Sequence, residues 1–320
     1  MTAHAATTPH VRTERAGKSP VPWSACRIVV ILALAVTVPE AAVACGNGSR
    51  QPSRSIATES ATRPPLASAP TLRVERNKIV DGAGTPIRLL GVNRSGSEFQ
   101  CVHSDAIWDG PVDNKAVAAI VSWHARAVRI ALNEDCWLGV HPVHPASSGQ
   151  PYRQAIAAYV ETLDAHGIVA ILDLHWSSGM WAGTASQCPD TAAACQKPMP
   201  DAAHAPTFWA SVAETFRTNL SVVFDVFNEP FPNATGGMTA DQSWDCWLRG
   251  GSACVGLTYP AAGMQQLVAA IRDTGAKNVV LVSGNGYAAD MTKWLAHRPI
   301  DPTGNLGAAW HSYSYDTCLD

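Results

Sequence analysis

The sequence predicts an α/β fold of the parallel barrel class, and three observations support this prediction. Apolar runs alternate with amphipathic segments along residues 71–320, and the runs have no polar face. Strands of this kind are covered on both faces and pair in parallel. Polar side chains follow each run, as they do at the C-terminal rim of a (β/α)8, or TIM, barrel. No glycine-rich phosphate loop follows the first run, which disfavours a doubly wound sheet.

Size and composition set the broad class of the protein. The 320 residues carry a formal net charge of −3, and 47% of them are apolar. A chain of this size can bury a large core. No basic run is interleaved with aromatic residues, so nucleic acid is not an expected partner. We expect a monomer that uses no cofactor.

Residues 1–44 have the features of a secretory signal peptide. Basic residues precede an apolar run at residues 28–38, and a small-residue exit with Ala42 and Ala44 follows. The run is too short to span a bilayer comfortably. We therefore expect an exported protein, either secreted or held at the cell envelope.

Cys45 directly follows the expected cleavage point, and two outcomes are open for it. Either the leader is simply removed, or Cys45 becomes a lipidated N-terminus that anchors the chain to a membrane. Residues 45–70 are rich in Ser, Pro and Ala and predict a disordered linker. The folded domain is then expected over residues 71–320.

The folded part is predicted to begin with a small hairpin, residues 72–80 and 87–93, which closes the floor of the barrel. Apolar runs then predict barrel strands, and apolar residues at helical spacing predict the helices between them. The predicted strands are 86–93, 128–132, 168–174, 222–227, 278–286 and 306–315. The predicted helices are 114–124, 152–166, 207–216, 259–274 and 288–297. These make six of the eight units of a complete barrel.

The stretch SVVFDVFNEP, residues 221–230, gives the strongest single indication of a functional site. Its strand-forming run ends in Asn228, Glu229 and Pro230, and proline has no N–H to continue a ladder. A carboxylate is therefore held at the C-terminal tip of a buried strand, where barrel enzymes place their chemistry. The alternative is a polar strand end that merely faces solvent.

Four strand-end motifs together resemble glycoside hydrolase family 5, the cellulase family of retaining (β/α)8 enzymes. The second strand reads VRIALN and the third reads LDLHW, and the resemblance implies substrate-site roles for Arg129 and His175. We also expect Trp176 at the substrate. The fourth strand ends in FNEP, which is the most telling of the four motifs. The likeness covers about residues 72–320.

The resemblance implies roles for the remaining motif residues. Asn228 would contact the sugar 2-hydroxyl, and Glu229 would be the catalytic acid/base. The sixth-strand motif HSY would place His311 and Tyr313 at the substrate. Retaining hydrolysis requires the acid to be protonated near neutral pH, so we expect the pKa of Glu229 to be raised.

The family pattern also requires a nucleophilic glutamate at the end of strand seven, and no residue of this sequence matches that position. Glu98, Glu134 and Glu214 lie elsewhere in the order. We therefore expect an exported hydrolase of a β-linked polysaccharide, a β-1,4-glucan or mannan, seen without its last quarter and inactive in this 320-residue form. The alternative is a non-catalytic carbohydrate-binding barrel.

Several side chains allow a second interpretation. Arg129 is either a substrate-site residue or a structural ion-pair partner. Trp176 and Trp181 either stack on sugar rings or pack in the core. A metal at the histidine pair His141 and His144 is disfavoured, because a proline-rich loop places histidines arbitrarily. We expect no metal site.

Cysteine spacing predicts disulfides, as an exported chain allows. Two pairs lie close in sequence, and a third follows strands one and two, which are neighbours in a barrel. The predicted pairs are Cys188 with Cys195, Cys246 with Cys254, and Cys101 with Cys136. Cys318 is left over, which is a second indication of a missing C-terminal part.

Overall fold

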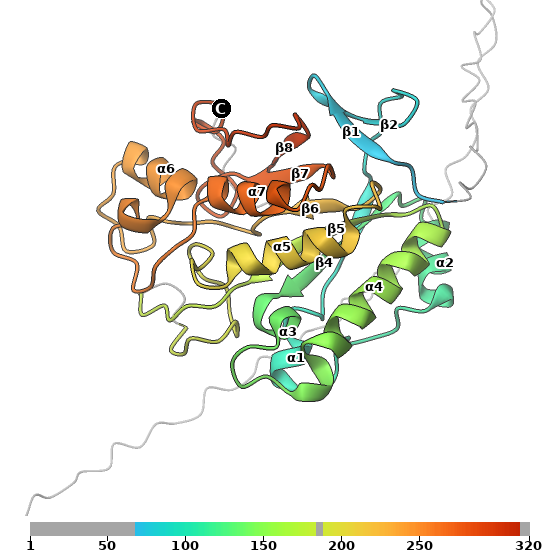
Figure 1. Cartoon of the computed structure of the whole chain (residues 1–320), viewed down its shortest axis with the longest axis horizontal. Coiled ribbons are helices and arrows are strands. Elements are labelled where there is room, and N and C mark those ends of the chain that lie inside the picture. The colour runs from blue at the N-terminus through green and yellow to red at the C-terminus, as the bar shows by residue number, and fades with distance from the viewer. Residues whose placement is uncertain (1–67, 184–187, 314–320) are drawn as a thin grey trace, which may run out of the picture. The chain divides into compact units, whose positions relative to one another are not determined.

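The computed structural model describes residues 68–183 and 188–313 (Figure 1). The predicted leader, Cys45, Cys318 and nearly all of the predicted linker lie outside these residues. The strands are β1 Leu72–Glu75, β2 Lys78–Asp81, β3 Gly91–Arg94, β4 Ala127–Asn133, β5 Val169–Trp176, β6 Val223–Asp225, β7 Val280–Ser283 and β8 Leu306–Ala309. The helices are α1 Gln100–His103, α2 Asn114–Ser122, α3 Glu134–Leu138, α4 Gln150–Ala165, α5 Ala205–Phe216, α6 Ala240–Arg249 and α7 Met264–Asp273. Two short 3-10 turns are η1 Pro145–Ser147 and η2 Gly251–Ala253.

Six parallel strands form one sheet in the order β3-β4-β5-β6-β7-β8. Each strand pairs with the next one along the chain, so that Ala127 of β4 lies opposite Val169 of β5. A Cβ atom at Gly91 would collide with the carbonyl of Ala127, so glycine lets β3 approach β4 closely. This order confirms the predicted α/β fold, because sequential parallel strands form an arc of a TIM barrel.

Helices cover the sheet because their apolar faces are buried against it. α4 packs on β5, and α5 packs against α7 (Figure 1). α5 buries Phe208, Trp209 and Val212 in the main core. The strands are buried along most of their length, as expected for strands covered on both faces. Among the described residues, no helix is both long and apolar enough to cross a membrane.

The floor of the sheet is closed by a separate apolar cluster, but the hairpin there pairs residues 72–75 with 78–81 rather than 72–80 with 87–93 as predicted. β1 and β2 pair as an antiparallel hairpin. Leu72 of this hairpin joins a buried cluster with residues at the start of the barrel strands, Ala127, Val169, Val223 and Val279. The backbone N–H of Leu72 also donates to the carbonyl of Leu220 (2.9 Å). The hairpin therefore fixes the end of the sheet opposite the polar strand tips.

Two predicted helices differ from the structure. α7 begins at Met264 rather than at residue 259, because Ala261 and Ala262 form isolated β-bridges and Gly263 occupies the N-cap. Residues 288–297 form turns instead of a helix. Asn285 and Asp290 pair there through their backbones, and Ala288 has a positive φ of 64° that interrupts a right-handed helix.

Three helices, the short α1 and α3 and the longer α6, were not predicted from the apolar pattern, and α6 is the longest of them. Its N-terminus is a capping box, in which Thr239 accepts from the Gln242 N–H (3.2 Å) and the Gln242 side chain accepts from the Thr239 N–H (2.8 Å). Its buried face uses Trp244 and Trp247. This helix lies in the long connection between β6 and α7.

All three predicted disulfides are present in the described residues. Cys101 and Cys136 join the segments that follow β3 and β4, with their Cα atoms 6.1 Å apart. The two local pairs are Cys188 with Cys195 and Cys246 with Cys254. The first of these local bridges closes a turn in the loop between β5 and α5.

Candidate active site

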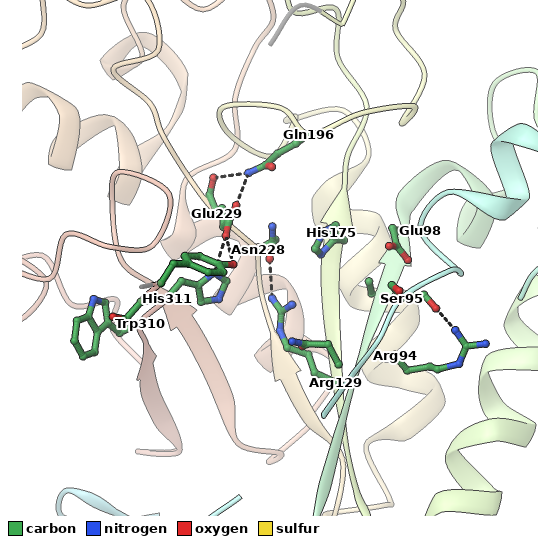
Figure 2. A pocket seen from close by; sticks show the side chains of 14 residues that line it. Arg94, Ser95, Glu98, Arg129, His175, Gln196, Asn228, Glu229, Trp310 and His311 are labelled. Atoms are coloured by element: carbon green, nitrogen blue, oxygen red, sulfur yellow. Dashed lines mark hydrogen bonds and ion pairs between the residues drawn. The ribbon is translucent and has the colours of Figure 1, made fainter. Parts of the chain in front are cut away.

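A pocket of about 540 Å³ opens where the barrel strands end (Figure 2). Polar and charged side chains make up most of its wall, which suits a hydroxyl-rich ligand better than an apolar one. The lining residues are Asn93, Arg94, Ser95, Glu98, Arg129, Ala131, His175, Gln196, Asn228, Glu229, Trp310, His311, Ser312 and Tyr313.

The extended chain after β6 places Glu229 at the edge of this pocket. The N–H of Val226 donates to the carbonyl of Leu281 (3.0 Å) in β7, and the N–H of Asn228 donates to the carbonyl of Leu174 (3.0 Å) in β5. The segment is thus held from both sides beyond the last residue of β6. Buried Trp209 adds a hydrogen bond from Nε1 to the Val226 carbonyl (2.9 Å).

Three side chains converge on the carboxylate of Glu229 (Figure 2). Nδ1 of His311 lies 2.9 Å from Oε1, and the Tyr313 hydroxyl donates to the same oxygen at 3.2 Å. Nε2 of Gln196 donates to Oε2 at 3.2 Å. Both oxygens therefore accept hydrogen bonds, and His311 and Tyr313 come from the chain that follows β8.

The pKa of Glu229 is lowered, which contradicts the expectation of a raised value. Burial acts to raise it, but hydrogen bonds from His311, Gln196 and Tyr313 outweigh burial. Donors to a carboxylate favour its charged form. In the described residues Glu229 is therefore held as an anion, and the sequence-based expectation overlooked these donors.

Arg129 is anchored beneath Glu229 by two buried carboxylates. Its Nε lies 2.9 Å from Asp225 Oδ2, and one Nη lies 3.0 Å from Asp173 Oδ1. The same Nη donates to Asn228 Oδ1 at 3.0 Å. Arg129 is thus a structural ion-pair partner that also lines the pocket, and its role at the substrate stays a prediction.

Burial and charge act in opposite directions on the pKa values of this cluster. Burial acts to lower the pKa of Arg129, but the charges of Asp173 and Asp225 outweigh it and raise that pKa. Burial raises the pKa of Asp225 to about 6, although Arg129 acts in the opposite direction. One guanidinium therefore faces two carboxylates.

His175 is oriented by the strand on which it lies. Its Nδ1 lies 2.7 Å from Asp173 Oδ2, two residues earlier in β5. Burial acts to lower the pKa of His175, but the charge and hydrogen bond of Asp173 raise it above its ordinary value. Nδ1 is committed to Asp173, so Nε2 remains for a ligand in the pocket.

The opposite wall of the pocket comes from the chain after β3. Figure 2 shows Glu98, Ser95 and Arg94 across the pocket from Glu229. Burial raises the pKa of Glu98, whose Oε2 accepts from the Gly96 N–H at 2.7 Å. Arg94 is tied to Asp109 at 2.6 Å. This wall adds a second acid to the site that the strand-end motifs did not single out.

The structure brings six of the seven predicted site residues together in one pocket. They are Arg129, His175, Asn228, Glu229, His311 and Tyr313. The seventh, Trp176, does not line the pocket and instead lies edge-on to His103 at 6.2 Å. Trp181 is fully buried, which favours the packing interpretation for that residue.

Sequence reasoning missed Gln196, Trp310 and the buried pair Asp173 and Asp225. Each of the two aspartates lies in a quoted motif region, LDLHW and VVFDVFNEP, so their inward position on β5 and β6 was readable from strand alternation. Gln196 lies in an irregular loop after Cys195. No periodicity signals such a residue, and only the fold brings it to Glu229.

The two histidines at which a metal was disfavoured, His141 and His144, lie in different local structures. His141 Nδ1 lies 2.9 Å from Asp135 Oδ2. His144 precedes the turn η1 as its N-cap. The two histidines thus have separate structural surroundings in the described chain.

An arc of sequential parallel strands with acids, histidines and an arginine at its carboxyl ends defines a TIM-barrel protein with a rim site. The chain matches the family model described as Cellulase (glycosyl hydrolase family 5) over residues 80–318. It therefore belongs to this family, as the strand-end motifs indicated. No match was found among curated proteins.

Solved structures of glucanases and mannanases share the fold. A β-glucanase from Saccharophagus degradans, solved with cellotetraose, has a TM-score of 0.55 and 18% identity over 80% of this chain and 66% of its own. A mannanase catalytic domain from Streptomyces sp. SirexAA-E has a TM-score of 0.51 and 20% identity, covering 79% and 65%. A β-mannanase from Thermomonospora fusca has a TM-score of 0.50 and 17% identity, covering 77% and 66%. The chain spans just under two thirds of the length of these structures.

Proposed function

We propose that this chain is the catalytic part of a glycoside hydrolase that cleaves a β-linked polysaccharide of the glucan or mannan type. One observation carries the proposal most directly. Glu229 lies at the rim of a polar pocket with an amide, two histidines and an arginine around it. Family membership and the fold shared with glucanases and mannanases support the same class.

The proposed reaction is a retaining double displacement. Glu229 gives its proton to the glycosidic oxygen while a second carboxylate attacks the anomeric carbon, and the leaving sugar departs with that proton. Glu229, now a base, takes a proton from water, and the water oxygen displaces the enzyme carboxylate. Such a pair of carboxyl groups lies about 5–5.5 Å apart. We assign the second carboxylate to the seventh strand of the complete barrel, which is not β7 and lies outside the described residues.

The neighbours of Glu229 suit this chemistry. The amide oxygen of Asn228 accepts from Arg129, so its nitrogen is left to donate to a sugar hydroxyl (Figure 2). Nε2 of His175 faces the ligand because Nδ1 is held by Asp173. A hydrogen bond to the 2-hydroxyl that strengthens in the transition state contributes several kcal/mol in this class of reaction.

The lowered pKa of Glu229 is an observation that favours a second candidate function. A glutamate that stays ionised at neutral pH can bind a sugar but cannot protonate a leaving group. The alternative is thus a carbohydrate-binding barrel without catalysis. The two candidates differ in one respect: a second carboxylate facing Glu229 would raise the pKa of Glu229 by charge repulsion.

Hydrolysis assays on the natural protein that contains this chain separate the candidates. We expect new reducing ends from soluble β-1,4-glucan or β-mannan, and nuclear magnetic resonance should show the β-anomer as the first product. Glu214→Gln, an exposed change on α5, serves as the control with unaltered activity. Saturable binding of oligosaccharides without any bond cleavage would establish the binding protein instead.

We propose that the protein is exported, and the three disulfides support an oxidising compartment. The proposed domains remain a leader at residues 1–44, a linker at 45–70 and the hydrolase at 71–320. Mass spectrometry of the mature N-terminus tests these boundaries and shows directly whether Cys45 carries lipid. Light scattering of the purified protein tests the expected monomer.

A further inference from the structure

A buried cluster of ligand-type side chains lies outside the pocket. Glu134 is the first residue of α3, directly after β4, while Asp201 and His204 precede α5. One oxygen or nitrogen from each of these three residues lies within 4.8 Å of the other two. None of the three lines the pocket around Glu229.

Each residue of this cluster has one buried polar atom that makes no hydrogen bond among the described residues. These atoms are Glu134 Oε2, Asp201 Oδ2 and His204 Nδ1. Glu134 is fully buried and Asp201 is 4% exposed. A polar atom buried without a partner is costly, and native proteins rarely leave three together.

The other oxygen of each carboxylate is fixed by backbone donors. Glu134 Oε1 accepts from the Ser178 N–H at 3.1 Å. Asp201 Oδ1 accepts from the N–H groups of Ala203 at 3.0 Å and His204 at 2.8 Å. These bonds hold both side chains in place with their second oxygen turned toward the shared space.

Neighbouring charges do not fill this space. Asp135 is occupied by the Ser178 hydroxyl, the Ala193 N–H and His141. Lys197 directs its ammonium group to the carbonyls of Asp190 (3.4 Å) and Ala192 (3.1 Å). The imidazole Nδ1 of His204 lies 3.3 Å from Asp201 Oδ1.

We propose that Glu134, Asp201 and His204 bind a divalent metal ion of the zinc type. One imidazole and two carboxylates suit zinc or another first-row ion better than calcium, which prefers oxygen ligands alone. Zinc ligands at about 2.0–2.2 Å lie roughly 3.4 Å from one another in a tetrahedron, so modest side-chain rotation closes the observed spacing. The side chain of His204 is 31% exposed, which leaves room for a water as fourth ligand and for the ion to enter.

The ion would act on structure rather than on the sugar. Glu134 belongs to the β4 side of the sheet, whereas Asp201 ends the long loop that starts after β5. This loop also carries Gln196, which donates to Glu229. A metal would therefore pin the end of the loop to the barrel. The proposal does not depend on the role of Glu229.

Metal analysis of the purified 320-residue chain, prepared without a polyhistidine tag, tests the site. After stripping with a chelator, the protein is dialysed against zinc, manganese or calcium, and bound metal is counted by mass spectrometry. We expect one zinc per chain and a higher melting temperature with zinc than without it, because an ion that binds only the folded state stabilises it.

Two variants localise the ion. His204→Asn removes the imidazole and leaves a side chain favoured at a helix N-cap, and Glu134→Gln keeps the acceptor for Ser178. Both should lose at least nine-tenths of the bound zinc and the zinc-dependent melting shift. His124→Asn, an exposed histidine with a positive φ of 59°, is the matched control and should keep both.

Two outcomes would overturn the proposal. If the unaltered chain retains none of the three metals, Glu134 and Asp201 share a proton instead. If His204→Asn and Glu134→Gln bind as much zinc as His124→Asn does, the ion is held elsewhere. Because the readout is metal content and melting temperature, neither outcome bears on sugar cleavage.

Discussion

At the scale of single residues, the protonation of Glu229 is set by its donors. Gln196 reaches this carboxylate from a loop that is itself tied to the strand end, since the N–H of Phe231 donates to the carbonyl of Pro198 (2.8 Å). Hydrogen bonds to a carboxylate favour its charged form. Gln196 therefore helps to decide at which pH Glu229 can act as an acid.

Gln196→Ala should raise the pKa of Glu229, because one of its donors is lost while burial remains. In the natural protein, the basic limb of the pH–activity profile should move to higher pH, with a smaller change in the Michaelis constant. Gln266→Ala, exposed on α7, is the control. A profile that keeps its position while activity falls would show that Gln196 only holds the loop.

A second prediction at the scale of residues concerns Asp225 and the way in which its contribution to stability depends on pH. Its pKa is about 6 in the folded protein against an ordinary value of 3.8, because it is buried. The contribution of Asp225 to the free energy of unfolding is therefore largest below about pH 4. This contribution falls by on the order of 3 kcal/mol as the pH rises through 6. Asp225→Asn does not titrate.

Urea unfolding at pH 4 and pH 7 checks this prediction. The free energy of unfolding of Asp225→Asn, relative to the unaltered protein, should rise between these two pH values. A difference that is the same at both would mean that Arg129 keeps Asp225 ionised throughout, in line with the 2.9 Å contact between them.

At the scale of elements, the connection from α7 to β8 depends on one buried arginine. Arg272 pairs with both oxygens of Asp301 at 2.8 and 3.0 Å. It also donates to the carbonyls of Ala276 (3.0 Å) and Asn278 (2.9 Å). One side chain thus satisfies the end of α7, the start of β7 and the loop before β8.

Arg272→Ala should lower the free energy of unfolding by about 3–5 kcal/mol, because it leaves a buried carboxylate and two carbonyls without their donor. Arg249→Ala removes an exposed pair with Asp245 and should cost at most about 0.5 kcal/mol. Denaturant titration of the two variants gives the comparison. Equal losses would contradict the role assigned to Arg272.

At the scale of the whole molecule, the disulfide between Cys101 and Cys136 restricts the unfolded chain most among the three described bridges. Its sequence separation is 35, compared with 7 and 8 for the other two. The entropy of loop closure grows with loop length, so this bridge should contribute about 3–4 kcal/mol.

Replacing both cysteines of the long bridge by alanine should therefore destabilise the protein more than replacing Cys246 and Cys254. The difference between the two double variants should be about 1 kcal/mol in urea. A larger loss of stability on removing the short bridge would show that native packing, and not loop closure, determines how much a disulfide stabilises this protein.

Much of this architecture could be predicted from the sequence, because barrel strands are apolar runs with polar ends. The stretch around Glu229 and the helix α4 both follow from local patterns that the core enforces. The turns at residues 288–297 could not be predicted. Their apolar residues imitate a helix, but tertiary contacts such as the bond from Trp294 Nε1 to the Val282 carbonyl (3.0 Å) override propensity.

The site divides in the same way. Residues at strand ends, such as His175 and His311, could be predicted from motifs because the carboxyl ends of the strands meet at one rim. Gln196 and the cluster of Glu134, Asp201 and His204 are not readable, because their positions depend on how long loops fold over the barrel. The donors to Glu229 also explain why the pKa expected from the reaction differs from the one the structure supports.

The central claim is that Glu229 protonates the leaving sugar, and the most direct test compares two leaving groups. In the natural protein, Glu229→Gln should reduce polysaccharide hydrolysis by about 10²–10⁴-fold, since general acid catalysis is worth that much. Formation of the glycosyl-enzyme from a dinitrophenyl glycoside, whose leaving group needs no proton, should be far less affected. Equal loss on both substrates, or full activity on the polysaccharide, would contradict the account.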